Sequence, residues 1–143
     1  MNQSLLSSPM TRDEIEQLRQ AMQAHCFQHA PAGEYFTLTS GRKSRYYYNG
    51  KMVTLHPRWR RTIGDVLAEI VLETRAEAVG GMALGACPIA DAVSDSAYLR
   101  HGTTLPVFIV RPAPKGHGTR EEMAFAYAED GRPLLTSGRK VAI

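Results

Sequence analysis

Residues 77–88 read Glu-Ala-Val-Gly-Gly-Met-Ala-Leu-Gly-Ala-Cys-Pro, a short apolar run that passes into a turn of small residues. From Ile89 to Ala97 apolar residues recur at helical spacing, which predicts a strand, a loop and a helix in succession. The β-rich run Pro106-Val-Phe-Ile-Val110 comes after that helix. Because strands that alternate with helices are typical of parallel sheets, this part of the chain favours an α/β fold.

The residues before this segment predict one helix followed by short strands. Thr11-Arg12-Asp13-Glu14 has the spacing of a capping box, so we expect a helix to begin there and to end at Ala30-Pro-Ala-Gly33. Between Glu34 and Leu55, Tyr, Phe and Thr surround the breaks Ser40-Gly41 and Asn49-Gly50. That pattern predicts short strands joined by tight turns.

Three further elements complete the expected sheet and its helices. From Pro57 to about Thr74 the apolar residues fall on one helical face, which predicts a second amphipathic helix. Residues 123–127 and 140–143 are expected to be two more strands. We therefore expect a parallel sheet flanked by helices.

Composition and charge narrow the class of protein. The chain has 143 residues, 43% of them hydrophobic and 22% charged, which is the profile of one soluble globular domain. Its net charge is +3, but no run of Lys and Arg is longer than Arg60-Arg61, so nucleic acid is not an expected partner. A small excess of positive charge also suits an enzyme that acts on phosphorylated small molecules.

The spacing of the cysteines bears on metal binding, and the first ten residues bear on cellular location. Cys26 and Cys87 lie in no CxxC or Cys/His cluster, so we expect no protein-bound metal. The first ten residues lack the pattern of a secretory signal, and no apolar run has the length of a membrane span. A cytoplasmic protein without a membrane partner is therefore expected.

A loop after the strand at 106–110 concentrates basic side chains. Arg111 can grip a phosphate with two parallel hydrogen bonds, Lys115 can supply a mobile charge, and His117 can donate a proton near neutral pH. Loops after strands of α/β sheets are where such folds place ligands. An ordinary solvated surface loop would have the same residues, so both interpretations stay open at this point.

Two other segments are weaker candidates. The glycine-rich turn at 80–88 precedes a helix and can offer backbone amides to an anion, but it matches no known nucleotide-binding fingerprint. Tyr46-Tyr47-Tyr48 can form an aromatic wall for a planar base, with Arg42 and Lys43 nearby for an acidic one. Alternation along a strand allows at most two of the three tyrosines on one side, and simple packing is the other explanation.

The order of these motifs resembles that of bacterial orotate phosphoribosyltransferases. The resemblance runs from about Glu34 to Ile143. It rests on Phe-Thr-Leu-Thr-Ser-Gly-Arg-Lys-Ser-Arg-Tyr-Tyr-Tyr-Asn-Gly-Lys at 36–51, Val-Thr-Leu-His-Pro at 53–57, the glycine-rich turn at 81–90, and Val110-Arg111 to Lys-Gly-His-Gly-Thr at 115–119. The first and last of these stretches are the specific ones.

The resemblance implies a type I phosphoribosyltransferase fold, with an N-terminal hood over the sheet. It divides the chain into an N-terminal helical segment at 1–33 and a partial phosphoribosyltransferase domain at 34–143. The implied reaction joins orotate to 5-phosphoribosyl 1-diphosphate, with Mg²⁺ bound alongside the diphosphate, and gives orotidine 5′-monophosphate for pyrimidine synthesis. The implied assembly is a homodimer in which loop 111–120 reaches the neighbouring subunit.

Residue roles follow from the same resemblance. It assigns diphosphate binding to Arg111, Lys115 and His117, and catalysis to Lys115 and His117. It assigns orotate binding to Tyr47, Tyr48, Leu84 and Gly85, the last two through backbone.

Some positions depart from the family pattern. Pro112 stands where the family has a second lysine, Pro114 stiffens the same loop, and Thr39 and Gly85 replace lysines that some members have. Cys87 stands where an acidic residue is usual.

The sequence stops at Ile143, before the acidic and Thr/Gly-rich segment that binds the ribose phosphate in the family. We therefore expect a C-terminally truncated form with an incomplete fold and weak or no activity alone. The alternatives are a non-catalytic binding or regulatory remnant and a phosphoribosyltransferase for another base.

Overall fold

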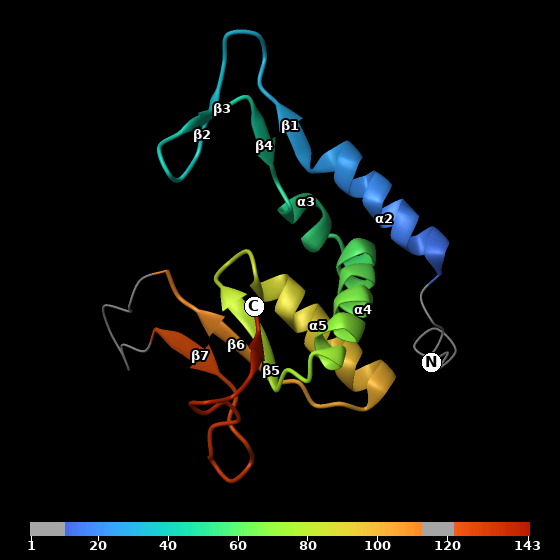
Figure 1. Cartoon of the computed structure of the whole chain (residues 1–143), viewed down its shortest axis with the longest axis vertical. Coiled ribbons are helices and arrows are strands. Elements are labelled where there is room, and N and C mark those ends of the chain that lie inside the picture. The colour runs from blue at the N-terminus through green and yellow to red at the C-terminus, as the bar shows by residue number, and fades with distance from the viewer. Residues whose placement is uncertain (1–10, 113–121) are drawn as a thin grey trace.

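The computed structural model describes residues 11–112 and 122–143, which form a sheet body with a hood above it (Figure 1). The sheet has the strand order β7-β6-β5-β8. Its strands are β5 (Ala78–Met82), β6 (Val107–Val110), β7 (Met123–Phe125) and β8 (Val141–Ala142). The β5 strand pairs in parallel with β6 and β8, as the sequence predicts, whereas β7 runs antiparallel to β6. The expected parallel sheet flanked by helices is therefore present, with β7 as an antiparallel edge strand.

Two long helices pack on the sheet and on each other. They are α4 (Pro57–Glu73) and α5 (Cys87–His101), close to the ranges that the apolar periodicity predicts. The buried cluster between the helices and the sheet consists of Ala68, Val79, Ala90, Val93, Ala97 and Leu105. This core holds β5 and α5 in place, and with them the turn that joins the two elements.

The core depends on two glycines that allow close approach. A Cβ atom at Gly64 of α4 would lie 2.5 Å from the carbonyl oxygen of Ala92 in α5. A Cβ atom at Gly80 would lie 2.0 Å from the carbonyl oxygen of Phe108. Both distances are far below van der Waals contact, so the helix crossing and the β5–β6 pairing each require glycine.

The N-terminal hood consists of residues 12–54 (Figure 1). Its elements are α2 (Arg12–His25), β1 (Phe27–His29), β2 (Phe36–Thr37), β3 (Lys43–Ser44), β4 (Tyr46–Tyr48) and α3 (Lys51–Thr54). In the hood, β1 pairs with β4 and β2 pairs with β3, both antiparallel. A small core of Ala21, Cys26 and Val53, with Trp59 and Ile63 packed against it, joins the hood to α4.

Two sequence expectations fail in the hood. The first helix ends at His25 and not near residue 30, because Phe27 to His29 leave the helix to pair with β4. The apolar spacing of Cys26 fits a helix, but this residue is the C-cap and lies fully buried. Lys51–Thr54 forms a short helix where strands were expected.

The capping box at the start of α2 is present as predicted. The Thr11 amide and hydroxyl both donate to Oε2 of Glu14, and the Glu14 amide donates to the Thr11 hydroxyl at 3.2 Å. These bonds favour the carboxylate, so the pKa of Glu14 lies below its ordinary 4.5. A group whose pKa is lowered by folding stabilises the fold above its unfolded pKa, and this contribution is lost as the pH falls.

We expect Thr11→Ala to lower the free energy of unfolding by about 1 kcal/mol at neutral pH, because the first turn of α2 loses its side-chain acceptor. Urea unfolding followed by circular dichroism measures the change. Thr11→Ser keeps the hydroxyl and should unfold like the wild type. Equal stability of the alanine and serine variants at neutral pH would contradict a stabilising role for the box.

Candidate functional site

The turn between β5 and α5 lies at the carboxyl edge of the sheet. The Ala83 amide donates to the Val110 carbonyl at 2.8 Å, which ties the turn to the end of β6. Leu84 is 82% exposed, and Gly85 is also exposed. Gly81 permits the turn, since a Cβ atom there would lie 2.8 Å from the Ala86 Cβ. The turn therefore presents its backbone and the Leu84 side chain to solvent.

Arg111 lies directly after β6, at the same edge of the sheet as the turn. The parallel register pairs Met82 with Val110, so both strands end at this level. The Arg111 amide donates to the Glu122 carbonyl at 2.8 Å, and Val110 pairs with Met123 of β7. Both ends of the basic loop are thus fixed on neighbouring strands. The candidate residues Lys115 and His117 lie outside the described residues.

The antiparallel register of β1 and β4 separates the candidate tyrosines. Phe27 pairs with Tyr48 and Gln28 with Tyr47. Neighbouring side chains along a strand point to opposite faces, so Tyr47 and Tyr48 do not share a face. The Tyr47 ring packs on Phe36 with centroids 5.5 Å apart, whereas the Tyr48 ring packs on Phe27 at 5.0 Å. A planar base can therefore stack on one of these rings and not on both.

The hydroxyl group of Tyr48 is engaged in the hood. Burial and a hydrogen bond with the Cys26 side chain raise the pKa of Tyr48 above its usual value, so its phenol stays protonated. Cys26 is fully buried beside Val53. Tyr48 thus ties β4 to the hood core, whereas the Tyr47 ring lies on the other face of β4 against Phe36.

The described positions that depart from the family pattern lie in three places: the turn between β2 and β3, the turn between β5 and α5, and the residue after Arg111. Thr39 is exposed in the turn between β2 and β3, where Gly41 has a φ of +78°. Pro112 follows Arg111 and is exposed. Cys87 is the first residue of α5, and its amide donates to the Leu84 carbonyl at 3.2 Å. Gly85 belongs to the exposed turn described above, and Pro114 lies outside the described residues.

Metal ligands do not gather within the described residues. No group of three or more His, Cys, Asp or Glu side chains among them is placed to hold a metal ion. Mg²⁺ bound with a diphosphate takes much of its coordination from phosphate oxygens and water, so it does not require such a group. We therefore assign no described side chain as a metal ligand.

Sequence reasoning missed two contacts that shape the site. The pairing of the Arg111 amide with Glu122 depends on the direction of β7, which no local pattern reveals. The bond between Tyr48 and Cys26 depends on the β1–β4 register. The signal that could have indicated β1 is the aromatic content of Phe27-Gln28-His29, which favours a strand.

Comparison with known proteins gives relatives of one kind. The orotate phosphoribosyltransferase of Nostoc sp. is 45% identical over 109 residues, which are 76% of this chain and 48% of that protein. The Synechocystis sp. orotate phosphoribosyltransferase is 40% identical over 130 residues, covering 90% of this chain and 61% of that protein. Over its matched residues the chain is similar to orotate phosphoribosyltransferases.

Solved structures agree with this similarity. Orotate phosphoribosyltransferase from Mycobacterium tuberculosis in complex with Fe(III) dicitrate matches with a TM-score of 0.63 and 26% identity, over 90% of this chain and 64% of that one. The same enzyme in complex with 5-phospho-alpha-D-ribosyl 1-diphosphate matches with a TM-score of 0.51 and 28% identity, over 73% and 57% of the two chains. The fold is therefore that of a type I phosphoribosyltransferase.

The similarity covers only part of the length of the relatives. No family model matches the chain. The orotate phosphoribosyltransferase family match covers 48% of the Nostoc relative, so the chain spans about half the length of that curated relative. Within the described residues, no helix is both long and apolar enough for a membrane span.

Proposed function

We propose that the protein transfers the 5-phosphoribosyl group from phosphoribosyl diphosphate to orotate, giving orotidine 5′-monophosphate and diphosphate. The observation that carries the proposal is the meeting of the turn at 83–86 and Arg111 at one edge of the sheet. These are the segments that match the base and diphosphate sides of the family site. The Mycobacterium tuberculosis relative with bound phosphoribosyl diphosphate supports the same donor.

The base side of the proposed site consists of the hood and the turn. We propose that the Tyr47 ring stacks on orotate, that Tyr48 contributes its backbone, and that Leu84 and Gly85 contact the base from the turn. Lys43 lies on β3, the strand whose partner β2 carries the Phe36 that packs on Tyr47. A cation there suits the carboxylate of orotate, which an uncharged base lacks.

The diphosphate side of the proposed site consists of Arg111 and the loop after it. The reaction joins N1 of orotate to the anomeric carbon as the bond from that carbon to the diphosphate breaks. Negative charge grows on the leaving diphosphate, so Arg111 and Lys115 stabilise it electrostatically. His117 acts as a proton donor to it.

Two further features belong to the same proposal. Mg²⁺ would bind with the diphosphate and neutralise part of its charge. The protein would act as a cytoplasmic homodimer in which loop 111–120 reaches the site of the partner. The residues at either side of this loop, Arg111 and Glu122, are joined by a backbone hydrogen bond at the ends of β6 and β7.

We expect Tyr47→Ala to weaken orotate binding by about tenfold or more, because stacking of a base on an aromatic ring is lost. Isothermal titration of the protein with orotate measures the change. Tyr46→Ala is the matched control, since Tyr46 pairs with His29 and shares the other face of β4 with Tyr48. Equal affinities of the two alanine variants for orotate would count against Tyr47 as the base contact.

A further inference from the structure

The strands of the hood form two separate ribbons, β1 with β4 and β2 with β3, and Tyr47 belongs to both (Figure 1). Its backbone lies in β4, opposite Gln28 of β1. Its ring packs on Phe36 of β2, with the ring centroids 5.5 Å apart and the ring planes inclined by 36°. The direction of the Tyr47 ring therefore depends on how the two ribbons are joined.

A single residue, Arg45, joins the two ribbons. The β3 strand ends at Ser44 and the β4 strand begins at Tyr46, and the chain bends at Arg45 between them. The Arg45 carbonyl accepts a hydrogen bond from the Ala30 amide at 2.8 Å, and Ala30 is buried. One side of the bend is therefore fixed to the residue that follows β1.

The strand pairing leaves the backbone groups of Tyr46 without a partner on β1. In an antiparallel pair only alternate residues exchange hydrogen bonds with the opposite strand. Because the bond from Ala30 goes to Arg45, the amide and carbonyl of Tyr46 point away from β1. They need another partner at the bend.

The Ser44 side chain is that partner. Its hydroxyl donates to the Tyr46 carbonyl at 2.7 Å and accepts from the Tyr46 amide at 3.1 Å. Serine hydroxyls bond to nearby backbone groups in this way and hold bends that strand pairing does not. Ser44 also lies opposite Phe36 in the β2–β3 register, so both side chains lie on one face of that ribbon.

We propose that Ser44 is a positioning residue for the base contact: its hydroxyl fixes the bend at Arg45 and thereby holds the Tyr47 ring in the orientation that stacks on orotate. This role rests on the proposed function, in which Tyr47 is the stacking ring. The Tyr47 side chain is 39% exposed, so its packing on Phe36 leaves part of the ring open to a base. Without the hydroxyl the ring samples more orientations, and binding has to restrict them.

Isothermal titration with orotate tests this role. Ser44→Ala should raise the dissociation constant for orotate about fivefold, which is the effect of one net hydrogen bond. Ser44→Thr keeps the hydroxyl and should bind orotate like the wild type. Thr37→Val is the matched control and should leave the affinity unchanged, because it removes an exposed hydroxyl from the other face of the same ribbon.

A double variant shows whether Ser44 acts through Tyr47. In a Tyr47→Ala background the ring is absent, so Ser44→Ala should weaken orotate binding no further. A hydroxyl that only stabilises the hood would weaken binding by the same factor in both backgrounds. That result would overturn the inference, as would wild-type affinity of the single Ser44→Ala variant.

Nuclear magnetic resonance of the same variants separates this inference from the proposed function. Nuclear Overhauser cross-peaks between the Phe36 and Tyr47 rings should be present in the wild type and in Ser44→Thr, and weaker in Ser44→Ala. Intact cross-peaks in Ser44→Ala, in a protein that binds orotate, would reject the role of Ser44 and leave the function. Weakened cross-peaks in a protein that never binds orotate would reject the function and leave the hold of Ser44 on Tyr47.

Discussion

Gly80→Ala should lower the free energy of unfolding by about 3 kcal/mol or more, because one added methyl group forces apart the central pair of strands. The Cβ atom would lie 2.0 Å from the Phe108 carbonyl oxygen and 2.7 Å from two carbons of the Phe108 ring. The backbone oxygen cannot rotate away as a flexible side chain would. Relief therefore requires β5 and β6 to separate, in the middle of the sheet.

Urea unfolding followed by circular dichroism measures this loss, and Gly85→Ala is the matched control. Gly85 belongs to the turn after the same strand, and a Cβ atom there would meet no atom within 4 Å. The control should stay within about 0.5 kcal/mol of the wild type. If Gly80→Ala is as stable as Gly85→Ala, the β5–β6 register described above is wrong.

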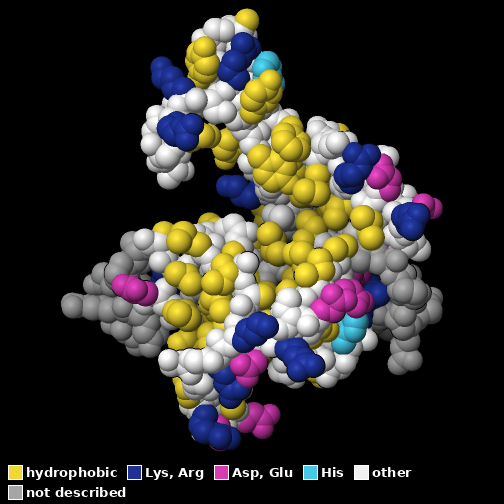
Figure 2. Space-filling model, in the orientation of Figure 1, with side chains coloured by type: hydrophobic (Ala, Val, Ile, Leu, Met, Phe, Trp, Pro, Cys, Tyr) yellow, Lys and Arg dark blue, Asp and Glu magenta, His cyan; other side chains and the backbone are white. Residues whose placement is uncertain are grey.

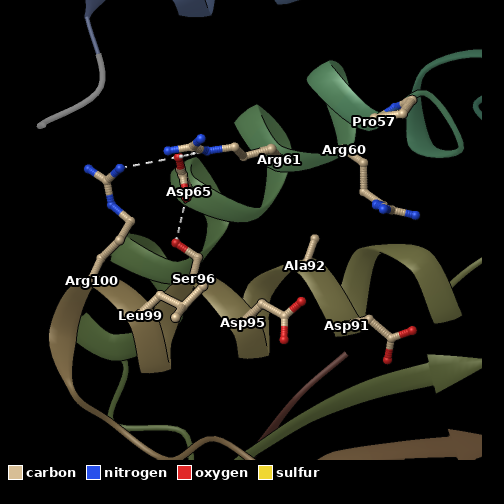
Figure 3. Close-up of a pocket in the computed structure, with 10 residues that line it drawn as sticks. All are labelled: Pro57, Arg60, Arg61, Asp65, Asp91, Ala92, Asp95, Ser96, Leu99 and Arg100. Carbon is tan, nitrogen blue, oxygen red and sulfur yellow. Dashed lines mark hydrogen bonds and ion pairs between the residues drawn. The ribbon is translucent and has the colours of Figure 1, made fainter. Parts of the chain in front are cut away.

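Asp65→Ala should lower the free energy of unfolding by about 3 kcal/mol, because it removes a carboxylate of α4 that bonds to Ser96 and Arg100 of α5. The Ser96 hydroxyl is buried and loses its acceptor, and the Arg100 guanidinium, with its side chain 11% exposed, loses an ion pair. The helices α4 and α5 are held together at this point by polar bonds and not by apolar contact alone (Figure 3).

Glu73→Ala is the control for this prediction, since Glu73 is an exposed acidic residue near the end of the same helix. Removing it should leave the unfolding midpoint in urea nearly unchanged. Ser96→Ala should have a smaller effect of about 1 kcal/mol, and the double variant with Asp65→Ala should lose less than the sum of the two. Additive losses would indicate that the Ser96–Asp65 bond does not form.

The sequence predicts the elements that local periodicity determines. α4, α5, β5 and β6 follow from one apolar face or one short apolar run, and the structure confirms them. The end of α2 does not follow, because Cys26 keeps helical spacing while the strand pairing of Phe27 with Tyr48 sets the boundary. The direction of β7 also depends on tertiary pairing, which a single strand does not reveal.

In the candidate site, too, local sequence patterns predict some features, and others depend on tertiary pairing. Period-two alternation predicts that Tyr47 and Tyr48 face apart, and the β1–β4 register agrees. The turn at 83–86 and Arg111 were separate candidates in the sequence and are adjacent only because β5 and β6 are parallel. The buried role of Asp65 had no local signal, since its partners Ser96 and Arg100 lie in another helix.

The hood exposes several large aromatic side chains. Hydrophobic side chains gather on the hood and on the hollow side of the body below it (Figure 2). Among them Tyr46 is 67% exposed and Phe27 60% exposed, which is unusual for large aromatic residues in a folded chain. The hood therefore exposes aromatic rings to solvent. The proposed base contact uses another ring of the hood, that of Tyr47.

Formation of orotidine 5′-monophosphate is the most direct test of the proposed transfer. The protein is incubated with orotate, labelled phosphoribosyl diphosphate and Mg²⁺, and the labelled nucleotide is separated and counted. We predict orotate-dependent product, formed slowly and with one diphosphate released per nucleotide, most of it lost in Arg111→Ala and retained in Arg132→Ala. Absence of orotate-dependent product, or transfer to another base in preference to orotate, would contradict the account.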